Sequence, residues 1–501
     1  MTTKSTSNKT SMSGKSFKER ISAAGKGQKL WFGVWTLLTI LFSVWAGNLW
    51  LMLFIVLFFD IYITKYIPWS FWRKSENKAF KKTMEWVDAI LFALVAVYFI
   101  NTFFFQNYQI PSSSLEKSLL VGDFLAVSKM SYGPRAPMTP LSFPLAQHTM
   151  PVIGGKSYFD KPQWKYKRLK GFGQVKRNDI VVFNFPAGDT VALNMQAVDY
   201  YTLSKYNSNG SLGIKSDRRT YGDVVYRPVD RRENYVKRCI GLPGETIELR
   251  DDEVYIDGNR IESPKLSQLT YMIHTDGTVI SENIFQELGV SKDDYLSVNN
   301  YGQTSQRMQD LTGIDSLTLA NSGLKSRNGV NGRVYFSIPL TQDMVSKLKE
   351  KPFVWDIIKD KEEPGSSYYY PIDANTNWTR DEFGPLWIPK KGETINFDDN
   401  IDFKVAAYER CIKNYEGNSF EYLNGQVFIN GKQVDSYTFE MDYYFMMGDN
   451  RHNSADSRAW GFVPEDHVVG KPMLIWLSLE KDKGWFEGRI RWKRLFTSAK
   501  K

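Results

Sequence analysis

Hydrophobic residues are concentrated near the start of this 501-residue chain. Residues 30–66 are almost continuously apolar. As a single helix they would be roughly 55 Å long, against about 30 Å of hydrocarbon in a bilayer. Because Gly47 and Asn48 interrupt the run, the pattern predicts two short membrane helices, 30–46 and 49–66, joined by a tight turn. One spanning helix followed by an interfacial helix is the alternative.

A third apolar run, Met84–Phe105, also has the length of a membrane helix. Basic residues gather on both sides of the first run, in a Ser/Lys/Gly-rich tail (1–29) that is expected to be disordered, and again in 70–82. Because basic flanks stay cytoplasmic, the third helix should end outside the cytoplasm. A cleaved signal peptide is a poor interpretation, since two more apolar runs follow and no A-x-A site ends the first. Residues 30–105 are therefore predicted to form a membrane region of two or three helices.

The chain after residue 105 contains no further apolar run of spanning length. We therefore expect one extracytoplasmic body, 106–480, followed by a basic C-terminal tail, 481–501. Two stretches, 134–176 and 264–402, read as long insertions to which the sequence assigns no role.

The body is predicted to be mainly β. Short apolar runs that end in Gly, Pro, Asn or Asp indicate strands, among them Phe124–Val127, Asp179–Phe185 and Val254–Asp257. Helical periodicity is scarce and supports only short helices at Gln303–Thr312 and Thr341–Lys351. The expected fold is thus a set of N-terminal transmembrane helices followed by a mainly antiparallel β domain.

Two parts of the chain are similar in sequence, an internal echo. Segment 238–240 resembles segment 410–412, and segment 253–260 resembles segment 426–432. Segment 253–260 contains Asp-Gly and segment 426–432 contains Asn-Gly, dipeptides that are typical of hairpin turns. A duplicated β unit and two ordinary hairpins both explain this similarity.

Charge and cysteine content exclude some function classes. Much of the net charge of +9 flanks the apolar runs, so orientation in a membrane explains it better than nucleic-acid binding does. The two cysteines, Cys239 and Cys411, are too few for a disulfide scaffold and form no C-x-x-C pair that would indicate zinc or redox chemistry. One bridge between them stays possible if the body lies outside the reducing cytosol.

Three consecutive serines, 112–114, follow the third apolar run. A serine there would sit at the membrane surface and would need a nearby base to act as a nucleophile. None of the four histidines stands in a pattern typical of a triad; they are His148, His274, His452 and His467. The alternative base is a buried lysine, because desolvation disfavours the ammonium form.

Two lysines compete for that role. Lys117 completes an S-x-x-K motif with Ser114, as in penicillin-binding proteins and β-lactamases, but the S-D-N and K-T-G motifs of those enzymes are missing. Lys237 lies in an apolar strand-like segment, where alternation would point it opposite to Val236 and Arg238. A lysine on a solvated strand edge is the ordinary alternative for Lys237.

Five blocks stand out in order along the chain. They are the apolar segment that ends near Phe105; Ile110–Leu115 with Leu119–Asp123; Arg177–Phe183; Tyr235–Arg238 with Gly241–Gly244; and Gly448–Arg451 with Asn453–Arg458, extended by Gly461–Pro464. Together they resemble the bacterial type I signal peptidases, which are membrane-bound serine peptidases with a Ser-Lys dyad. The resemblance implies an endopeptidase that cleaves N-terminal signal peptides from secretory precursors by way of an acyl-enzyme.

The resemblance also implies roles for single residues. Ser114 resembles the nucleophile and Lys237 its general base. The Ser112 hydroxyl would join the Ser114 amide in an oxyanion hole, where one donor is typically worth about 3 kcal/mol. Ser454 resembles the serine that positions the lysine amine, and the loop around it would be supported by Asp449, Arg451, Asp456 and Arg458.

A shallow apolar pocket is implied for small substrate residues at the first and third positions before the cut. Its expected residues are Tyr108, Ile110, Leu115, Leu119, Tyr235 and Val236. Core packing is the alternative role for Leu119.

The chain departs from the family pattern around the nucleophile. Ser113 stands where the family usually has glycine, and residues 115–117 stand where it usually has Met-x-Pro. The extra hydroxyl makes Ser113 a rival nucleophile, although the spacing from Ile110 favours Ser114. Loss of the proline should loosen the turn but removes no catalytic group.

The expected partners are secretory precursors and the lipid bilayer of a bacterial cell membrane, without nucleic acid, metal or organic cofactor. Two other functions remain open. One is a catalytically silent membrane scaffold that binds signal peptides or secretion machinery, against which the joint presence of four residues argues: Ser112, Ser114, Lys237 and Ser454. The other is a penicillin-interacting acyl transferase that uses Lys117.

Overall fold

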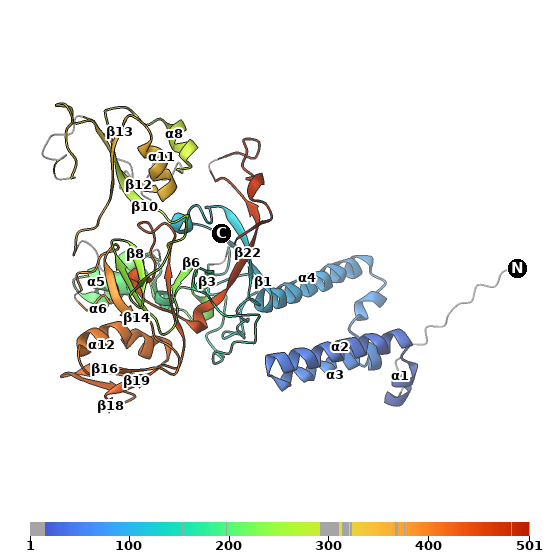
Figure 1. The fold of residues 1–501 in the computed structure, drawn as a ribbon. Coiled ribbons are helices and arrows are strands. Elements are labelled where there is room, and N and C mark those ends of the chain that lie inside the picture. Colours follow the sequence, from blue (N-terminus) through green and yellow to red (C-terminus); the bar gives the residue numbers. More distant parts are fainter. Residues whose placement is uncertain are drawn as a thin grey trace.

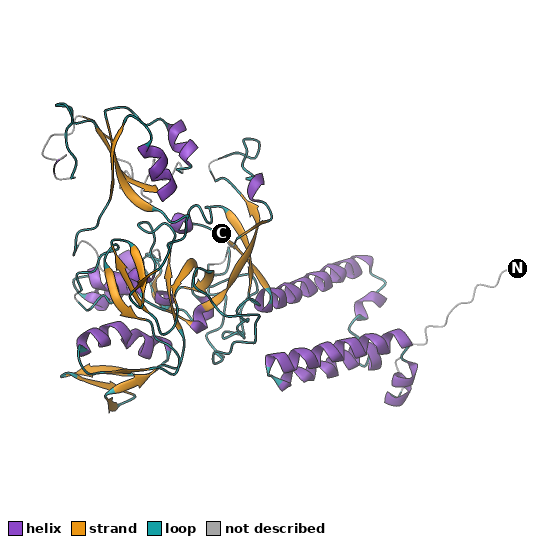
Figure 2. Ribbon diagram, viewed as in Figure 1, coloured by secondary structure: helices purple, strands orange, loops and turns teal. Residues whose placement is uncertain are grey.

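The computed structural model describes residues 16–152, 154–196, 198–290, 310–312, 320, 323–365, 369–374, 376–481 and 483–499. The N-terminal part is helical and projects from a body that is mainly β (Figures 1 and 2).

Helices begin earlier than the sequence pattern predicts. α1 (Phe17–Ala23) and the start of α2 (Lys26–Ala46) occupy part of the tail that was expected to be disordered, whose first 15 residues lie outside the described ones. The reason is a capping box, in which Ser16 and Glu19 each accept the other's backbone N–H. The predicted tight turn is confirmed at Gly47, whose left-handed backbone (φ 57°) suits glycine because it has no Cβ.

After this turn the chain lies back along α2 as a 3₁₀ turn η1 (Leu49–Met52), α3 (Leu53–Phe59) and a π turn η2 (Asp60–Thr64) (Figure 1). Among the described residues, α2 and α4 (Lys78–Phe103) are long and apolar enough to cross a membrane, whereas the returning segment is shorter than that. Both the helical hairpin and the spanning-plus-interfacial arrangement fit these lengths. A 3₁₀ turn η3 (Phe71–Lys74) precedes α4.

The central element of the body is an antiparallel sheet, in the order β1-β2-β22-β3-β6-β20-β21, with β23 added beside β22. The strands are β1 (Phe105–Gln109), β2 (Asp123–Ser128), β3 (Ile180–Asn184), β6 (Asn234–Gly241), β20 (Tyr443–Met447), β21 (Val463–Pro464), β22 (Val468–Ser478) and β23 (Thr497–Ser498). The predicted strands at 124–127 and 179–185 are confirmed. α4 leads directly into β1, so the sheet begins where the apolar helix ends.

The basic C-terminal segment packs onto this sheet. Its strand β23 pairs with β22, and Arg494 forms an ion pair of 2.5 Å with Asp123, whose side chain is fully buried. A second ion pair joins Arg491 to Glu480 at 2.9 Å.

A second layer carries the largest core. It contains a sheet of β7 (Thr246–Arg250), β8 (Glu253–Ile256), β9 (Asn259–Arg260) and β14 (Phe383–Trp387), the hairpin β16 (Phe420–Leu423), β17 (Gln426–Ile429) and β18 (Lys432–Val434), the pair β15 (Thr394–Asn396) and β19 (Ser436–Thr438), and α12 (Ile401–Arg410). α12 continues in a π turn η7 (Cys411–Tyr415) and was not predicted.

The internal echo is two ordinary hairpins. Segment 238–240 is strand in β6, whereas segment 410–412 spans the end of α12, so no unit is duplicated. Both turns form, with positive φ at each of their central residues. Cys239 and Cys411 are buried free thiols in different core clusters, and the possible bridge between them is not formed.

Residues 269–359 of the segment 264–402 build a separate lobe, at the top of Figure 1, whereas its later residues join the second layer through β14 and β15. The lobe consists of β10 (Leu269–Thr275), β11 (Asp310–Thr312), β12 (Arg333–Leu340) and β13 (Val354–Lys359), covered by α8 (Glu282–Leu288) and α11 (Gln342–Lys349) around a core of its own. α11 confirms the helix predicted at 341–351. Of the helix predicted at 303–312, residues 303–309 lie outside the described ones and the remainder is strand β11, which pairs with β12.

The segment 134–176 contains no helix or extended strand among its described residues, and it reaches the tip of the helical hairpin. Lys167 Nζ donates to the Ala46 carbonyl at 2.7 Å, and Trp45 Nε1 donates to the Lys170 carbonyl at 3.0 Å. Further along lie β4 (Thr190–Ala192), β5 (Val224–Tyr226) and three short helices that were not predicted, α5 (Tyr200–Tyr206), α6 (Gly210–Ser216) and α7 (Arg218–Tyr221).

Candidate active site

Two strand edges face the region around the three serines. β6 pairs with β3 over residues 234–238, but β20 pairs with β6 only at 238–241. The first half of β6 therefore has no strand on its second side, within the described strands, and neither does β1 beyond its pairing with β2. A 3₁₀ turn η4 (Ser113–Leu115) follows β1 and contacts β6.

This turn brings a serine hydroxyl to the lysine of β6. Lys237 Nζ donates to Ser114 Oγ at 2.7 Å, although the two residues are 123 positions apart. Both are buried, with 5% and 9% of their surface exposed. Strand alternation places Lys237 on the face of Tyr235 and Cys239, opposite to Val236, as the sequence pattern predicts. The arrangement brings together a hydroxyl nucleophile and an amine out of contact with bulk water.

Burial lowers the pKa of Lys237 to about 8, because the ammonium form loses its hydration. The carboxylates of Asp456 and Asp449 act in the opposite direction and raise this pKa. Both carboxylates are engaged by arginines, so neither forms an ion pair with Lys237. The amine is thus substantially neutral near pH 8.

Asp449 ties β6 to the turn after the serines. Arg238 donates to both of its oxygens, at 2.7 and 2.6 Å, and Ser118 Oγ donates to it at 2.5 Å. Such bidentate pairs are geometrically specific. Arg238 and Ser118 are supporting residues to which the sequence analysis assigned no role.

Asp456 and Arg458, two of the residues expected to support the loop, form an ion pair. The guanidinium donates to the two carboxylate oxygens at 2.9 and 2.8 Å, and one oxygen also accepts the Gly448 N–H at 3.1 Å. Arg451 is buried close to Arg458, and together burial and this neighbouring charge lower its pKa to about 10. Its backbone N–H donates to Gln268 O at 2.9 Å, so Arg451 supports the loop mainly through its main chain.

The loop Gly448–Arg458 holds the serine turn. Asn450 N donates to the Ser114 carbonyl at 3.0 Å, and Asn453 Nδ2 donates to Ser113 Oγ at 3.1 Å. Because the Ser113 hydroxyl is engaged with Asn453, it is Ser114 that meets the lysine. The two asparagines were quoted within a motif, but their contacts are visible only in the fold.

Ser112 and Ser454, the other two serines with an expected role, differ in their contacts. Ser112 Oγ lies 3.5 Å from Ser114 Oγ, close enough to border an oxyanion site. Ser454 Oγ is buried and has no hydrogen-bond partner in the described part of the chain, so the predicted bond to the Lys237 amine is not formed in this structure. Ser454 instead packs on Gly448, where an added Cβ would stand 2.3 Å from Ser454 Oγ and 2.6 Å from Ser114 O.

The six residues expected to form an apolar substrate pocket divide into three groups. Ile110, Leu115 and Leu119 are buried in one core cluster, and the 0% exposure of Leu119 assigns it to core packing. Tyr108 and Val236 are partly buried against that cluster. Tyr235 lies on the other face of β6, the face of Lys237, where its ring stacks on Phe185 with centroids 4.3 Å apart and lies with its centroid 5.7 Å from Lys237 Nζ.

Comparison with known proteins agrees with these features. Residues 83–307 and 434–477 match the family described as signal peptidase, peptidase S26. The chain belongs to this family.

Two relatives named signal peptidase I align along most of this peptidase, and a third matches a short segment of it. That of Buchnera aphidicola (subsp. Acyrthosiphon pisum, strain APS) is 23% identical over 84% of this chain and 83% of its own length. That of Haemophilus influenzae is 23% identical over 85% of this chain and 79% of its own length. A signal peptidase I of Aquifex aeolicus is 61% identical over 36 residues, 7% of this chain and 14% of its own length.

The rival lysine of the peptidase is directed elsewhere. Lys117 has a left-handed backbone (φ 73°), its Nζ donates to the Gly289 carbonyl in the lobe, and it lies 3.8 Å from Glu116. The S-x-x-K motif therefore does not bring its lysine to Ser114 in this structure.

The histidines of the peptidase take no part in the Ser114 contacts of the described residues. His148 contacts Glu233 at 2.7 Å, His274 contacts Asn331, and His467 contacts Asp466 at 2.6 Å.

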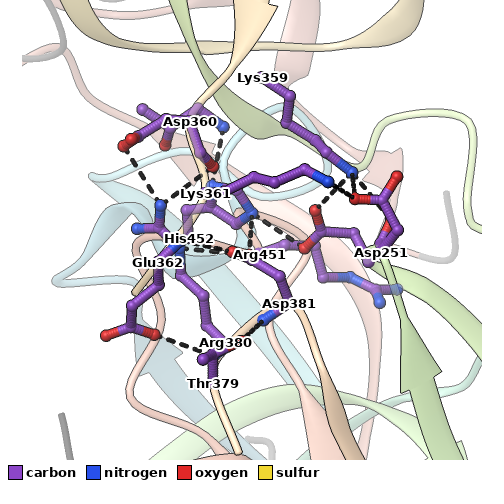
Figure 3. A network of polar contacts seen from close by, with 12 residues as sticks. Asp251, Lys359, Asp360, Lys361, Glu362, Thr379, Arg380, Asp381, Arg451 and His452 are labelled. Carbon is purple, nitrogen blue, oxygen red and sulfur yellow. Dashed lines mark hydrogen bonds and ion pairs between the residues drawn. The ribbon is translucent and has the colours of Figure 1, made fainter. Parts of the chain in front are cut away.

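His452 is the centre of a polar network that joins the loop Gly448–Arg458 to the lobe (Figure 3). Its Nδ1 accepts the Thr270 N–H at 3.2 Å, while its Nε2 lies 2.9 Å from Asp252 and 3.1 Å from Asp381. Hydrogen bonding from His452 lowers the pKa of Asp381, against the effect of burial. The lobe is thereby attached two residues before Ser454.

Asp252, Asp381 and His452 have the residue types of a metal site. Their hydrogen bonds, however, favour a proton and not a metal on His452. Since Nδ1 accepts the Thr270 N–H, the ring proton is on Nε2 and is donated to the carboxylates. A metal on Nε2 would move that proton to Nδ1, opposite another donor. The carboxylates are also neutralised by other side chains, Asp252 by Lys359 at 3.0 Å and Asp381 by Arg380 at 3.3 Å. Arg380 and Asp381 are labelled in Figure 3.

Proposed function

We propose that this chain is a membrane-bound endopeptidase that removes N-terminal signal peptides from secretory precursors, with Ser114 as nucleophile and Lys237 as general base. The observation that carries the proposal is the 2.7 Å contact between a buried, largely dehydrated amine and a serine hydroxyl. Family membership and relatives named signal peptidase I support the substrate class.

The chemistry follows from that contact. The neutral Lys237 amine accepts the Ser114 proton while Oγ attacks the carbonyl carbon of the scissile bond. The Ser114 N–H and the Ser112 hydroxyl would stabilise the resulting oxyanion, a contribution of roughly 3 kcal/mol for one such donor. The ammonium then protonates the departing amine and leaves an ester on Ser114. The same amine next takes a proton from water while the water oxygen attacks the ester. The bond between the acyl carbon and Ser114 Oγ then breaks, the lysine returns the proton to Oγ, and the signal peptide is released with a free carboxylate.

The free edges of β1 and β6 suit a peptide that binds as an added strand. Successive strands between them are antiparallel, so β1 and β6 run in the same direction, from the end of α4 toward Ser114 and Lys237. A precursor whose signal segment lies in the membrane would run the same way. Buried Ile110 and Leu115 would back the cleft wall that accepts small side chains.

The basic clusters and the helix lengths support a membrane orientation. The hairpin of α2 and the returning segment brings the described basic residues of 16–29 to the same side as those of 70–82, and α4 then leads away from them to the body. With basic flanks in the cytoplasm, the catalytic body lies outside it, in a multi-pass arrangement in a bacterial cell membrane.

Cleavage of a purified precursor by purified enzyme tests the proposal, with Ser114→Ala, Lys237→Ala and Lys117→Ala compared. We expect the first two variants to lose cleavage and the third to keep most of it. No cleavage by the unsubstituted protein would favour a silent scaffold. Loss only in Lys117→Ala would favour the acyl-transferase alternative.

A further inference from the structure

A cavity of about 570 Å³ lies where α4 meets the central sheet. Its wall includes Asn101 near the end of α4, Tyr108 of β1 and Asn234 of β6. The 3₁₀ turn η6 (Val229–Arg231) and residues 135–137 and 142–147 complete the wall. The cavity thus lies between the apolar helix and the two free strand edges.

Positive side chains dominate this cavity. Lys129, Arg135 and Arg231 line it, and Asp230 is the one carboxylate among its described lining residues. Asp230 accepts the Thr139 N–H at 2.8 Å and the Thr139 hydroxyl at 2.6 Å, and lies 3.9 Å from Arg231. Its charge is therefore shared between backbone contacts and one arginine, and a net positive charge remains.

The two arginines are held in place by the protein. Arg135 donates to Asn184 Oδ1 at 2.6 Å, and Arg231 donates to Ser142 Oγ at 2.9 Å. Arg231 Nε is buried without a hydrogen-bond partner in the described ranges. They form a fixed electropositive wall.

Among the three positively charged side chains of the cavity, Lys129 is the one that remains available to bind an anion. It follows β2 directly, and its backbone N–H donates to Phe104 O at 2.8 Å, which places it at the beginning of β1. Within the described chain its Nζ has no hydrogen bond and no ion pair. Burial lowers the pKa of Lys129 to about 7, Arg135 and Arg231 lower it further, and Asp230 opposes them. An anion in the cavity would restore the charged form of this amine.

The cavity lies upstream of the catalytic pair. β6 runs from Asn234, which lines the cavity, to Lys237, which contacts Ser114. At about 3.3 Å per residue, a peptide parallel to these strands would place residues roughly four to seven positions before the cut inside the cavity.

We propose that Lys129 is a specificity-determining residue, and that the cavity receives the precursor segment just upstream of the cleavage site and favours Asp or Glu there over Lys or Arg. This rests on the proposed function, because it concerns the substrate of the same cleft. A lipid phosphate is a second possible anion. The observations favour the peptide, since the cavity is continuous with the strand edges that lead to Ser114.

The test uses three precursors, identical except for Asp, Gln or Lys at one position, scanned from four to seven residues before the cut. For the unsubstituted full-length enzyme in vesicles of neutral phospholipid, we expect kcat/KM to be about tenfold higher for Asp than for Lys at one or more positions, which corresponds to partial screening of a charge contact. In Lys129→Glu this preference should reverse, and in Lys129→Arg it should persist. The control is Lys165→Glu, the same charge change at an exposed lysine outside the cavity.

Several outcomes would overturn the proposal. One is equal cleavage of the Asp and Lys precursors by the unsubstituted enzyme at every position. Another is an unchanged preference in Lys129→Glu, or in Lys129→Met should the glutamate variant not fold. A third is a preference that is insensitive to Lys129 while stimulation by anionic phospholipid vesicles is lost in the same variant, which would assign the cavity to a lipid headgroup. Cleavage of the Gln precursor in each case shows that the proposed function itself holds.

Discussion

Two lysines lie near Ser114 in very different surroundings. Lys117 is three residues away in sequence, yet its amine contacts Glu116 and a carbonyl of the lobe. Lys237 is 123 residues away, yet its amine is buried on β6 and contacts the serine hydroxyl. A carboxylate partner favours the ammonium form, whereas burial without an ion pair favours the neutral amine. The surroundings, and not the distance along the chain, therefore select the base.

The largest effect on cleavage should come from replacing a lysine by arginine, which keeps the positive charge but cannot become neutral. Lys237→Arg should lower kcat/KM by about 10³-fold or more, because a guanidinium stays protonated and cannot accept the serine proton. Lys117→Arg, the matched control, should change it by less than about threefold. Steady-state cleavage of a purified precursor measures both. Equal losses in the two variants would remove the distinction between the lysines.

The pH dependence of kcat/KM tests the same difference between Lys237 and Lys117 in the unsubstituted enzyme. Since the pKa of Lys237 is lowered to about 8, the neutral fraction falls as pH falls below that value. Cleavage should therefore rise with pH through about 8, and should drop roughly tenfold per pH unit well below it. The measurement is kcat/KM from pH 6 to 10. The profile should be unchanged in Lys117→Ala, and a midpoint that moves in this variant would contradict the assignment.

A smaller effect is expected at the junction between the loop and the lobe. His452→Gln removes the ring that connects Thr270 with two buried carboxylates, and the loss of a hydrogen bond to a charged group costs about 1.5–3 kcal/mol. We expect a lower Tm, together with a fall in kcat that exceeds any change in KM, because the loop next to Ser454 loses its attachment. Thermal unfolding and steady-state kinetics measure the two effects.

The control for that junction is His148→Gln, whose partner Glu233 is about half exposed. A surface contact of this kind is worth roughly 0–1 kcal/mol, so both Tm and kcat should stay near their original values. A fall in Tm for His452→Gln without a fall in kcat would show that the network stabilises the fold and does not position the loop.

Much of the local structure was predictable. The turn at Gly47, the strands β2 and β3 and the helix α11 follow from apolar periodicity and turn residues, which act over a few positions. The early start of the helices at Phe17 was missed because a capping box outweighed a polar composition.

The contacts that support the site were harder to predict from the sequence. Arg238 and Asp449 are 211 residues apart, and no periodic pattern joins them. The position of Tyr235 relative to the other expected pocket residues depends on which face of β6 packs on which core. The unpartnered hydroxyl of Ser454 likewise follows from how the loop packs on Gly448.

By itself, the sequence determined the apolar helices, the β character of the body and the candidates Ser114 and Lys237, because these are written in short patterns and motifs. Only the tertiary structure decided which lysine meets the serine, how far its pKa falls, and how the lobe is tied to the loop. These properties arise from burial and from contacts between segments far apart in the chain. How much water is excluded around an amine depends on every element that packs against it, and this burial cannot be predicted from a local sequence pattern.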